Sequence, residues 1–236
     1  LFILALRGLS SPETSRQGNL FGVTGMLIAI IVTFLSIGNF SSGFIYVLVF
    51  LLIGGIIGTF IAYKIPMTAM PELVAGFHSL VGLAAVFVAI AAFINPGAFN
   101  LGSPGNIKLA SLIEMSIGAA VGAITFSGSI IAFLKLQGIM SGAPITFKGQ
   151  HFLNAVILIS IVILTYFLCE TQSSKLFWIL LVTSFLIGFL IIIPIGGADM
   201  PVVISMLNSY SGWAAAGIGF TLENSALIIT GALVGS

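Results

Sequence analysis

Long, uninterrupted apolar runs constrain the fold of this chain more than any other feature of its sequence. The longest runs have about 20 residues each, the length that an α-helix needs to cross the hydrocarbon core of a bilayer. Charged residues make up 6% of the chain, against roughly 25% in a soluble domain. The runs are continuous rather than alternating, which favours helices over the strands of a membrane barrel. The sequence therefore predicts an all-α fold, a polytopic transmembrane helical bundle.

The predicted bundle has seven full spans and a partial span at each end. The apolar pieces at 1–6 and 224–236 are too short to cross a bilayer, and the chain starts with Leu1 rather than Met. We therefore expect residues 1–236 to form one transmembrane domain of a longer polypeptide. The full spans are expected at 19–38, 42–63, 73–95, 109–134, 152–169, 176–195 and 200–220.

Lys and Arg are distributed unevenly over the loops that join the spans. Cytoplasmic loops collect these residues, so the richer side should face the cytoplasm, or the matrix in a mitochondrion. The turn at 196–199 is expected on that same inner side. The richer side carries Arg7, Arg16, Lys64, Lys135 and Lys148, and the poorer side carries Lys108 and Lys175.

His78 is one of the few polar groups expected at membrane depth. Pro71 and Glu72 have the character of a first helical turn, which places His78 about two turns into the bilayer from the inner side. An imidazole gains and loses a proton near neutral pH, so His78 is a candidate proton carrier. The alternative is a neutral histidine that is bonded to a neighbouring hydroxyl.

Glu114 lies near the outer end of the fourth predicted span. Helical spacing places Gly118, Gly122 and Thr125 on the same face. This small, polar face suits either close packing or a wet path. Because charges at membrane depth are expensive and usually face an interior, Glu114 is a candidate for proton uptake from the outer side. The alternative is an interfacial acid near Lys108.

Asp199 and Asn208 form a third polar group. Asp199 precedes a proline and fits a helix N-cap, so capping alone would explain it. Asn208 falls in the middle of the last full span, with Ser205 and Ser209 on its face. An unpaired amide in hydrocarbon costs several kcal/mol, so Asn208 should face a partner or water. It belongs either to a hydrated route shared with His78 or to a hydrogen-bonded link between helices.

Several kinds of site are excluded by what the sequence lacks. A net charge of +1 leaves no basic face for nucleic acid. The glycine-rich pieces at 54–58 and 217–219 lie inside apolar spans, so neither is a dinucleotide fingerprint. The single cysteine, Cys169, cannot form an internal disulfide, and two histidines without paired cysteines argue against a metal site. We therefore expect this chain itself to bind no cofactor and no metal.

The sequence resembles the membrane domain of the proton-translocating NAD(P) transhydrogenase beta subunit. The resemblance is carried by long segments, among them GFHSLVG around His78 and MLNSYSGW around Asn208. It reaches nearly the whole chain. The matching segments are 10–22, 67–86, 113–133, 196–216 and 230–236.

The resemblance implies an enzyme that transfers a hydride between NAD(H) and NADP(H) on partner soluble domains and couples this step to proton movement. The implied partners are the lipid bilayer, the alpha subunit or an equivalent that supplies NAD(H)-binding and membrane segments, and an NADP(H)-binding domain after residue 236. The whole enzyme would be a homodimeric assembly in the bacterial cytoplasmic membrane or the mitochondrial inner membrane. His78 and Asn208 correspond to the family's channel residues, and Asp199 to an acid near the docking face of the NADP(H) domain.

We therefore expect His78 to carry protons while hydride transfer takes place outside this chain, which holds no catalytic residue. Two other functions remain open. A proton-coupled secondary transporter would be expected to show inverted repeats, which are not evident, and a passive membrane anchor would only hold soluble domains together. The residues expected along the proton pathway are His78, Asn208, Glu114, Ser79, Ser205 and Ser209.

Overall fold

The computed structural model describes residues 1–36 and 43–236. These residues form two compact units, 1–65 and 66–236, each of which is described by itself. Residues 37, 38 and 42 of the predicted spans lie outside the described residues.

The first unit contains α1 (Phe2–Leu9), α2 (Ser15–Ser36) and α3 (Gly43–Lys64). Helix α1 packs on α2 where Gly8 and Gly18 face each other. The backbones are so close that a Cβ on Gly8 would lie 2.6 Å from Cα of Gly18, so a side chain at Gly8 would not fit. The Thr14 hydroxyl donates a hydrogen bond to the Gly8 carbonyl at 2.7 Å. The predicted partial span at 1–6 is therefore the first helix of a short helical hairpin.

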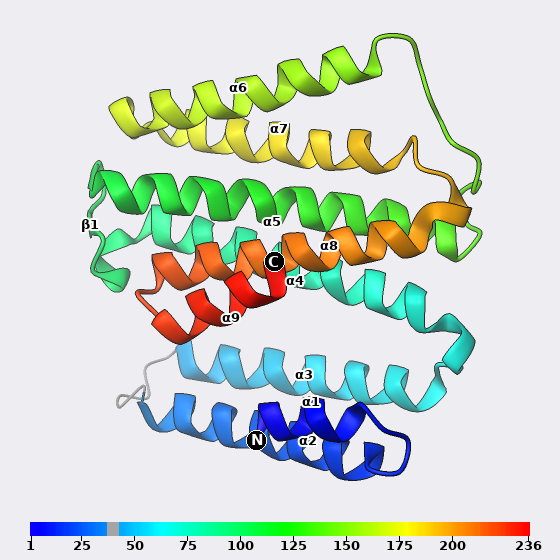
Figure 1. The fold of residues 1–236 in the computed structure, drawn as a ribbon. Helices are drawn as coiled ribbons and strands as arrows, with labels where there is room; N and C mark the ends of the chain where they lie inside the picture. The colour runs from blue at the N-terminus through cyan, green and yellow to red at the C-terminus, as the bar shows by residue number, and fades with distance from the viewer. Residues whose placement is uncertain (37–42) are drawn as a thin grey trace. The chain divides into compact units, whose positions relative to one another are not determined.

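The second unit is a helical bundle built around α5. Figure 1 shows this helix between α4, α7 and α8, with α6 beyond α7 and α9 beside α8. It is the most buried of the candidate spans. The helices of this unit are α4 (Met70–Ile94), α5 (Leu109–Leu136), α6 (Gln150–Thr171), α7 (Ser174–Ile192), α8 (Met200–Thr221) and α9 (Ser225–Gly235).

Six helices of the described chain are long and apolar enough to cross a membrane, namely α2 to α7. The predicted helical membrane fold is confirmed at this level. The ends of the seven predicted full spans differ from the ends of the corresponding helices by at most four residues. The seventh expected span, α8, is a helix of 22 residues. It is not among the six because Asn208 and three nearby serines interrupt its apolar sequence.

The fold departs from an entirely helical one in a small hairpin between α4 and α5. Strands β1 (Gly102–Ser103) and β2 (Asn106–Ile107) pair antiparallel. Pro104 and Gly105 form the turn between them, where the positive φ of Gly105, 80°, suits the third position of a type II turn. The Gln172 side chain accepts a hydrogen bond from the Ile107 amide (2.9 Å) and donates one to its carbonyl (3.1 Å). The loops before α5 and after α6 therefore lie at the same end of the unit.

Helices α4 and α5 approach most closely at a pair of glycines. A Cβ on Gly82 would lie 2.6 Å from the Gly122 carbonyl oxygen and 2.6 Å from the Phe126 amide nitrogen. Both of these atoms belong to the backbone of α5, so they cannot move aside as a flexible side chain would. Small residues that allow such an approach are typical of helix pairs in membranes.

We predict that Gly82→Ala destabilises the protein by about 1–3 kcal/mol, the usual cost of overpacking a tight interface. The change should appear as a lower midpoint of thermal unfolding, followed by circular dichroism on the purified full-length protein. Gly76→Ala, on the same helix, is the matched control, because its nearest neighbour is the Phe133 ring at 3.7 Å. Equal midpoints for the two variants would contradict the packing described here.

Candidate functional site

Helices α4 and α8 begin in the same way. Each follows a short 3-10 turn, Met67–Ala69 before α4 and Gly197–Asp199 before α8, and each opens with Met-Pro. Proline suits a first helical turn because the amide it lacks would have had no partner there. His78 and Asn208 each stand seven residues after the proline, and each is followed by a serine. At 1.5 Å per residue, both side chains lie about 10 Å along their helices.

The structure brings His78 and Asn208 into contact. Nε2 of His78 lies 3.0 Å from Oδ1 of Asn208. The other ring nitrogen, Nδ1, lies 2.7 Å from the carbonyl oxygen of Val74, one turn earlier on α4. The ring is half-buried, whereas Asn208 is exposed on the surface of its unit. The interhelical convergence that the sequence suggested is therefore present for these two residues.

The contacts of the imidazole link its charge to the orientation of the Asn208 amide. A backbone carbonyl only accepts, so Nδ1 must carry the proton that it donates to Val74. With Oδ1 of Asn208 facing Nε2, both ring nitrogens face acceptors, and the doubly protonated ring satisfies both. A neutral ring accepts at Nε2, which the amide can satisfy by turning its NH2 group toward the ring. The pair can thus stabilise either protonation state of His78.

A cavity of about 190 Å³ lies between α4, α8 and α9, one turn beyond the pair toward the C-terminal end of α8. Val81 and Ser211 line it, and each stands three residues after one member of the pair. The Ser211 hydroxyl donates to the Asn208 carbonyl at 2.7 Å, and Thr230 adds a second hydroxyl. The sequence prediction missed both hydroxyls, although helical spacing from Asn208 would have identified Ser211.

The three serines expected along the pathway lie near the pair without contacting the imidazole. Ser79 is buried and donates to the Gly76 carbonyl of its own helix at 2.7 Å. Ser205 is exposed and Ser209 half-buried on α8. Within the described chain, the hydroxyl groups of Ser205 and Ser209 have no hydrogen-bond partner, so both are available to water or to another protein.

Glu114 does not join this pair. The contact of Gly82 with Gly122 sets the register of α4 and α5. From that level, Glu114 lies eight residues toward the end of the bundle where α5 begins, and His78 lies four residues toward the opposite end, where α4 begins. At 1.5 Å per residue, roughly 18 Å of helix axis separates the two side chains. The small face of α5 beyond Glu114 is closely packed, with Gly118 against Gly217 of α8.

Asp199 occupies the N-cap position of α8, as its place before a proline predicted. Its side chain is exposed and makes no capping hydrogen bond. The carboxylate is therefore free to meet a partner at the end of the bundle where α8, the helix that carries Asn208, begins.

Lys135 was expected to be a loop cation, and this was wrong. It is 4% exposed, and its ammonium group donates to the carbonyls of Ile193 at 2.6 Å and Ile195 at 2.7 Å.

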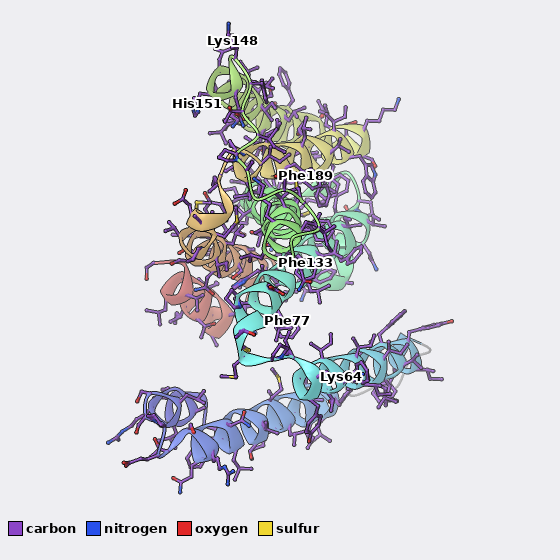
Figure 2. All side chains as sticks on the ribbon, turned by 90° about the vertical axis from the view of Figure 1, so that its right-hand side faces the viewer. Lys64, Phe77, Phe133, Lys148, His151 and Phe189 are labelled. Carbon is purple, nitrogen blue, oxygen red and sulfur yellow. The ribbon has the colours of Figure 1, made fainter. Side chains whose placement is uncertain are left out.

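By contrast, Lys148 and His151 are exposed at the start of α6. Figure 2 shows them at the margin of the unit, away from Phe77, the residue before His78. Among the described residues, no group of three His, Cys, Asp or Glu side chains could hold a metal ion.

Comparison with known proteins gives one consistent match. The profile of the family described as NAD(P) transhydrogenase beta subunit matches residues 1–236. A relative named NAD(P) transhydrogenase subunit beta, from Rhodospirillum rubrum, is 61% identical over 236 residues, which is 100% of this chain and 50% of that protein. A second sequence of the same name, from a named strain of that species, matches to the same extent. The chain therefore spans about half the length of the curated relatives that it matches.

Proposed function

Because this chain belongs to the NAD(P) transhydrogenase beta subunit family, we propose that it is the proton-conducting membrane part of a transhydrogenase. In this proposal, a hydride passes between NAD(H) and NADP(H) on soluble domains of the complex, and the step is coupled to proton movement through the bundle. The nucleotides belong to those domains, since the glycine-rich pieces of this chain lie within apolar helices.

The contact between His78 and Asn208 carries the proposal. A proton carrier at membrane depth needs a group that titrates near neutral pH and surroundings that accept both of its charge states. The Asn208 amide can offer His78 an acceptor or a donor, while Val74 holds Nδ1 in one role throughout. A change in the position of α8 would then alter the proton affinity of His78, and by linkage the reverse must also hold.

The energy available is sufficient for such coupling. A proton that crosses down a potential of 100 mV supplies about 2.3 kcal/mol. The two nicotinamide couples differ little in reduction potential, as the family resemblance implies. This amount of energy therefore displaces the hydride equilibrium more than tenfold, because a factor of ten corresponds to about 1.4 kcal/mol.

The proposed route has an inner and an outer part. On the outer side, the cavity beside Ser211 lies one turn beyond the pair, and we propose that water bridges the distance between this cavity and Glu114. On the inner side, Asp199 provides an exposed carboxylate at the start of α8, where we propose that the NADP(H)-binding domain docks. The exposed Ser205 and Asn208 would be costly in contact with lipid, so we propose that membrane segments of the alpha subunit, or water held by them, cover this face.

The test uses the complete enzyme in sealed liposomes that contain a pH-sensitive dye. Starting hydride transfer from NADPH to NAD+ should change the internal pH, and a protonophore should abolish the change. Hydride transfer without any pH change would instead indicate a passive anchor. A pH change that depends on an added solute and not on the nucleotides would indicate a secondary transporter.

A further inference from the structure

The inner end of α5 holds the connection that leads into α8. The ammonium group of Lys135 contacts three carbonyl oxygens, those of Ile193 at 2.6 Å, Ile195 at 2.7 Å and Ala143 at 3.4 Å. Ile193 directly follows α7, where helix carbonyls lack partners within the helix. An ammonium has three donors and no acceptor, so the three carbonyls match its bonding capacity. A Met at this position would fill the same space and leave all three carbonyls without this donor.

The same end of α5 also holds the start of α4. Gln137, two residues after Lys135, donates a hydrogen bond through its side chain to the carboxylate of Glu72, in the first turn of α4. The loop after α5 adds a backbone bond from the Gly197 amide to the Gly142 carbonyl at 2.8 Å. The start of α4 and the connection into α8 are therefore both attached to the C-terminal end of α5 and the loop that follows it.

This attachment contributes to the axial register of the pair, together with the glycine contacts of α5 with α4 and α8. His78 and Asn208 stand at equal distances from the beginnings of α4 and α8, so they meet only when the two beginnings lie level. Lys135 binds the carbonyl of Ile195, four residues before Asp199. A displacement of the Gly197–Asp199 turn would therefore have to strain or break the Lys135 contacts before α8 could slide against α4.

We propose that Lys135 is a positioning residue that keeps Asn208 level with His78 and so couples the state of the inner turn to the proton pair. This inference rests on the proposed proton-conducting function. Lys135 does not itself carry the proton, since its partners are backbone carbonyls and it lies beyond the reach of the imidazole, on another helix and nearer the inner end.

The experiment measures protons moved per hydride transferred by the complete enzyme in liposomes. Lys135→Met should lower this ratio about tenfold or more, because a displacement of about 1 Å in a reacting pair costs about 100-fold. Nucleotide affinity at the soluble domains should not change. Lys135→Arg keeps the charge and several donors, and should restore most of the ratio.

The matched control is Lys108→Met, at the opposite end of α5, where the exposed lysine contacts one carbonyl. The ratio of this variant should stay within about twofold of the unsubstituted value.

A purely structural role would reduce the amount of folded enzyme without changing the ratio. If Lys135→Met does not accumulate, Lys135→Gln decides the matter, because its shorter side chain has two donors and cannot replace all three bonds of the ammonium group: a lowered ratio supports the proposal and an unchanged ratio overturns it. An unchanged ratio in folded Lys135→Met, or an equal loss in Lys108→Met, also overturns the proposal.

If the unsubstituted enzyme moves no protons at all, the proposed function fails and this inference with it. Failure of the inference alone is recognised by normal pumping in Lys135→Met under conditions in which His78→Ala does not pump.

Discussion

Replacing His78 with alanine in the complete enzyme is expected to abolish coupled proton pumping. Proton transfer by a positioned acid–base group typically contributes 10²–10⁴-fold to a rate, so pumping should fall to about one hundredth or less. Glu114 cannot take the place of His78, because it lies roughly 18 Å away along the helices at 1.5 Å per residue. The measurement is the initial rate of internal pH change in liposomes after hydride transfer begins.

His151→Ala is the matched control for this prediction. His151 is the other histidine of the chain, and it is exposed at the start of α6. Its replacement should leave pumping unchanged, and nucleotide binding to the soluble domains should be normal in both variants. Normal pumping by His78→Ala would remove His78 from the mechanism.

The second large effect is expected from Asn208→Leu. Leucine has a similar size but offers neither a donor nor an acceptor to Nε2 of His78. A hydrogen bond to a charged group is worth about 1.5–3 kcal/mol, so the protonated ring should become about tenfold or more harder to form. Pumping should fall by a similar factor, while the helices remain folded because Asn208 is exposed within its unit.

Ser209→Ala separates this effect from a general disturbance of α8. Ser209 is the neighbour of Asn208 and makes no side-chain hydrogen bond among the described residues, so pumping should change less than about twofold. The comparison requires both variants to be present in the membrane in equal amounts. If the two variants had equal and negligible effects, Asn208 would be only a hydrogen-bonded link between helices.

The helices of the bundle could be predicted from sequence because the bilayer sets their length and apolar character. The predicted and observed boundaries of α5 agree at Leu109 and differ by two residues at Leu136. The hairpin at Gly102–Ile107 was missed because strands of two residues leave no periodic pattern. The pairing of α1 with α2 was missed because an apolar run of six residues does not indicate which helix it will contact.

The site could be predicted only in part. His78 and Asn208 stand out because polar groups are rare in these helices, and their pairing follows from a signal that the sequence holds, the Met-Pro start seven residues before each of them. Glu114 met the same criterion of rarity, but the helix register placed it elsewhere. The role of Lys135 depends on backbone carbonyls of a distant loop, and backbone groups carry no sequence signal.

The proposed mechanism requires that the protonation of His78 change during the cycle. Solid-state ¹⁵N NMR of the complete enzyme in bilayers, labelled at histidine, measures this directly when the spectrum of a His78→Gln variant is subtracted. At a fixed pH, we expect the His78 ring to be doubly protonated with one redox state of bound NADP(H) and singly protonated, at Nδ1, with the other. An identical ring spectrum in both nucleotide states would contradict it.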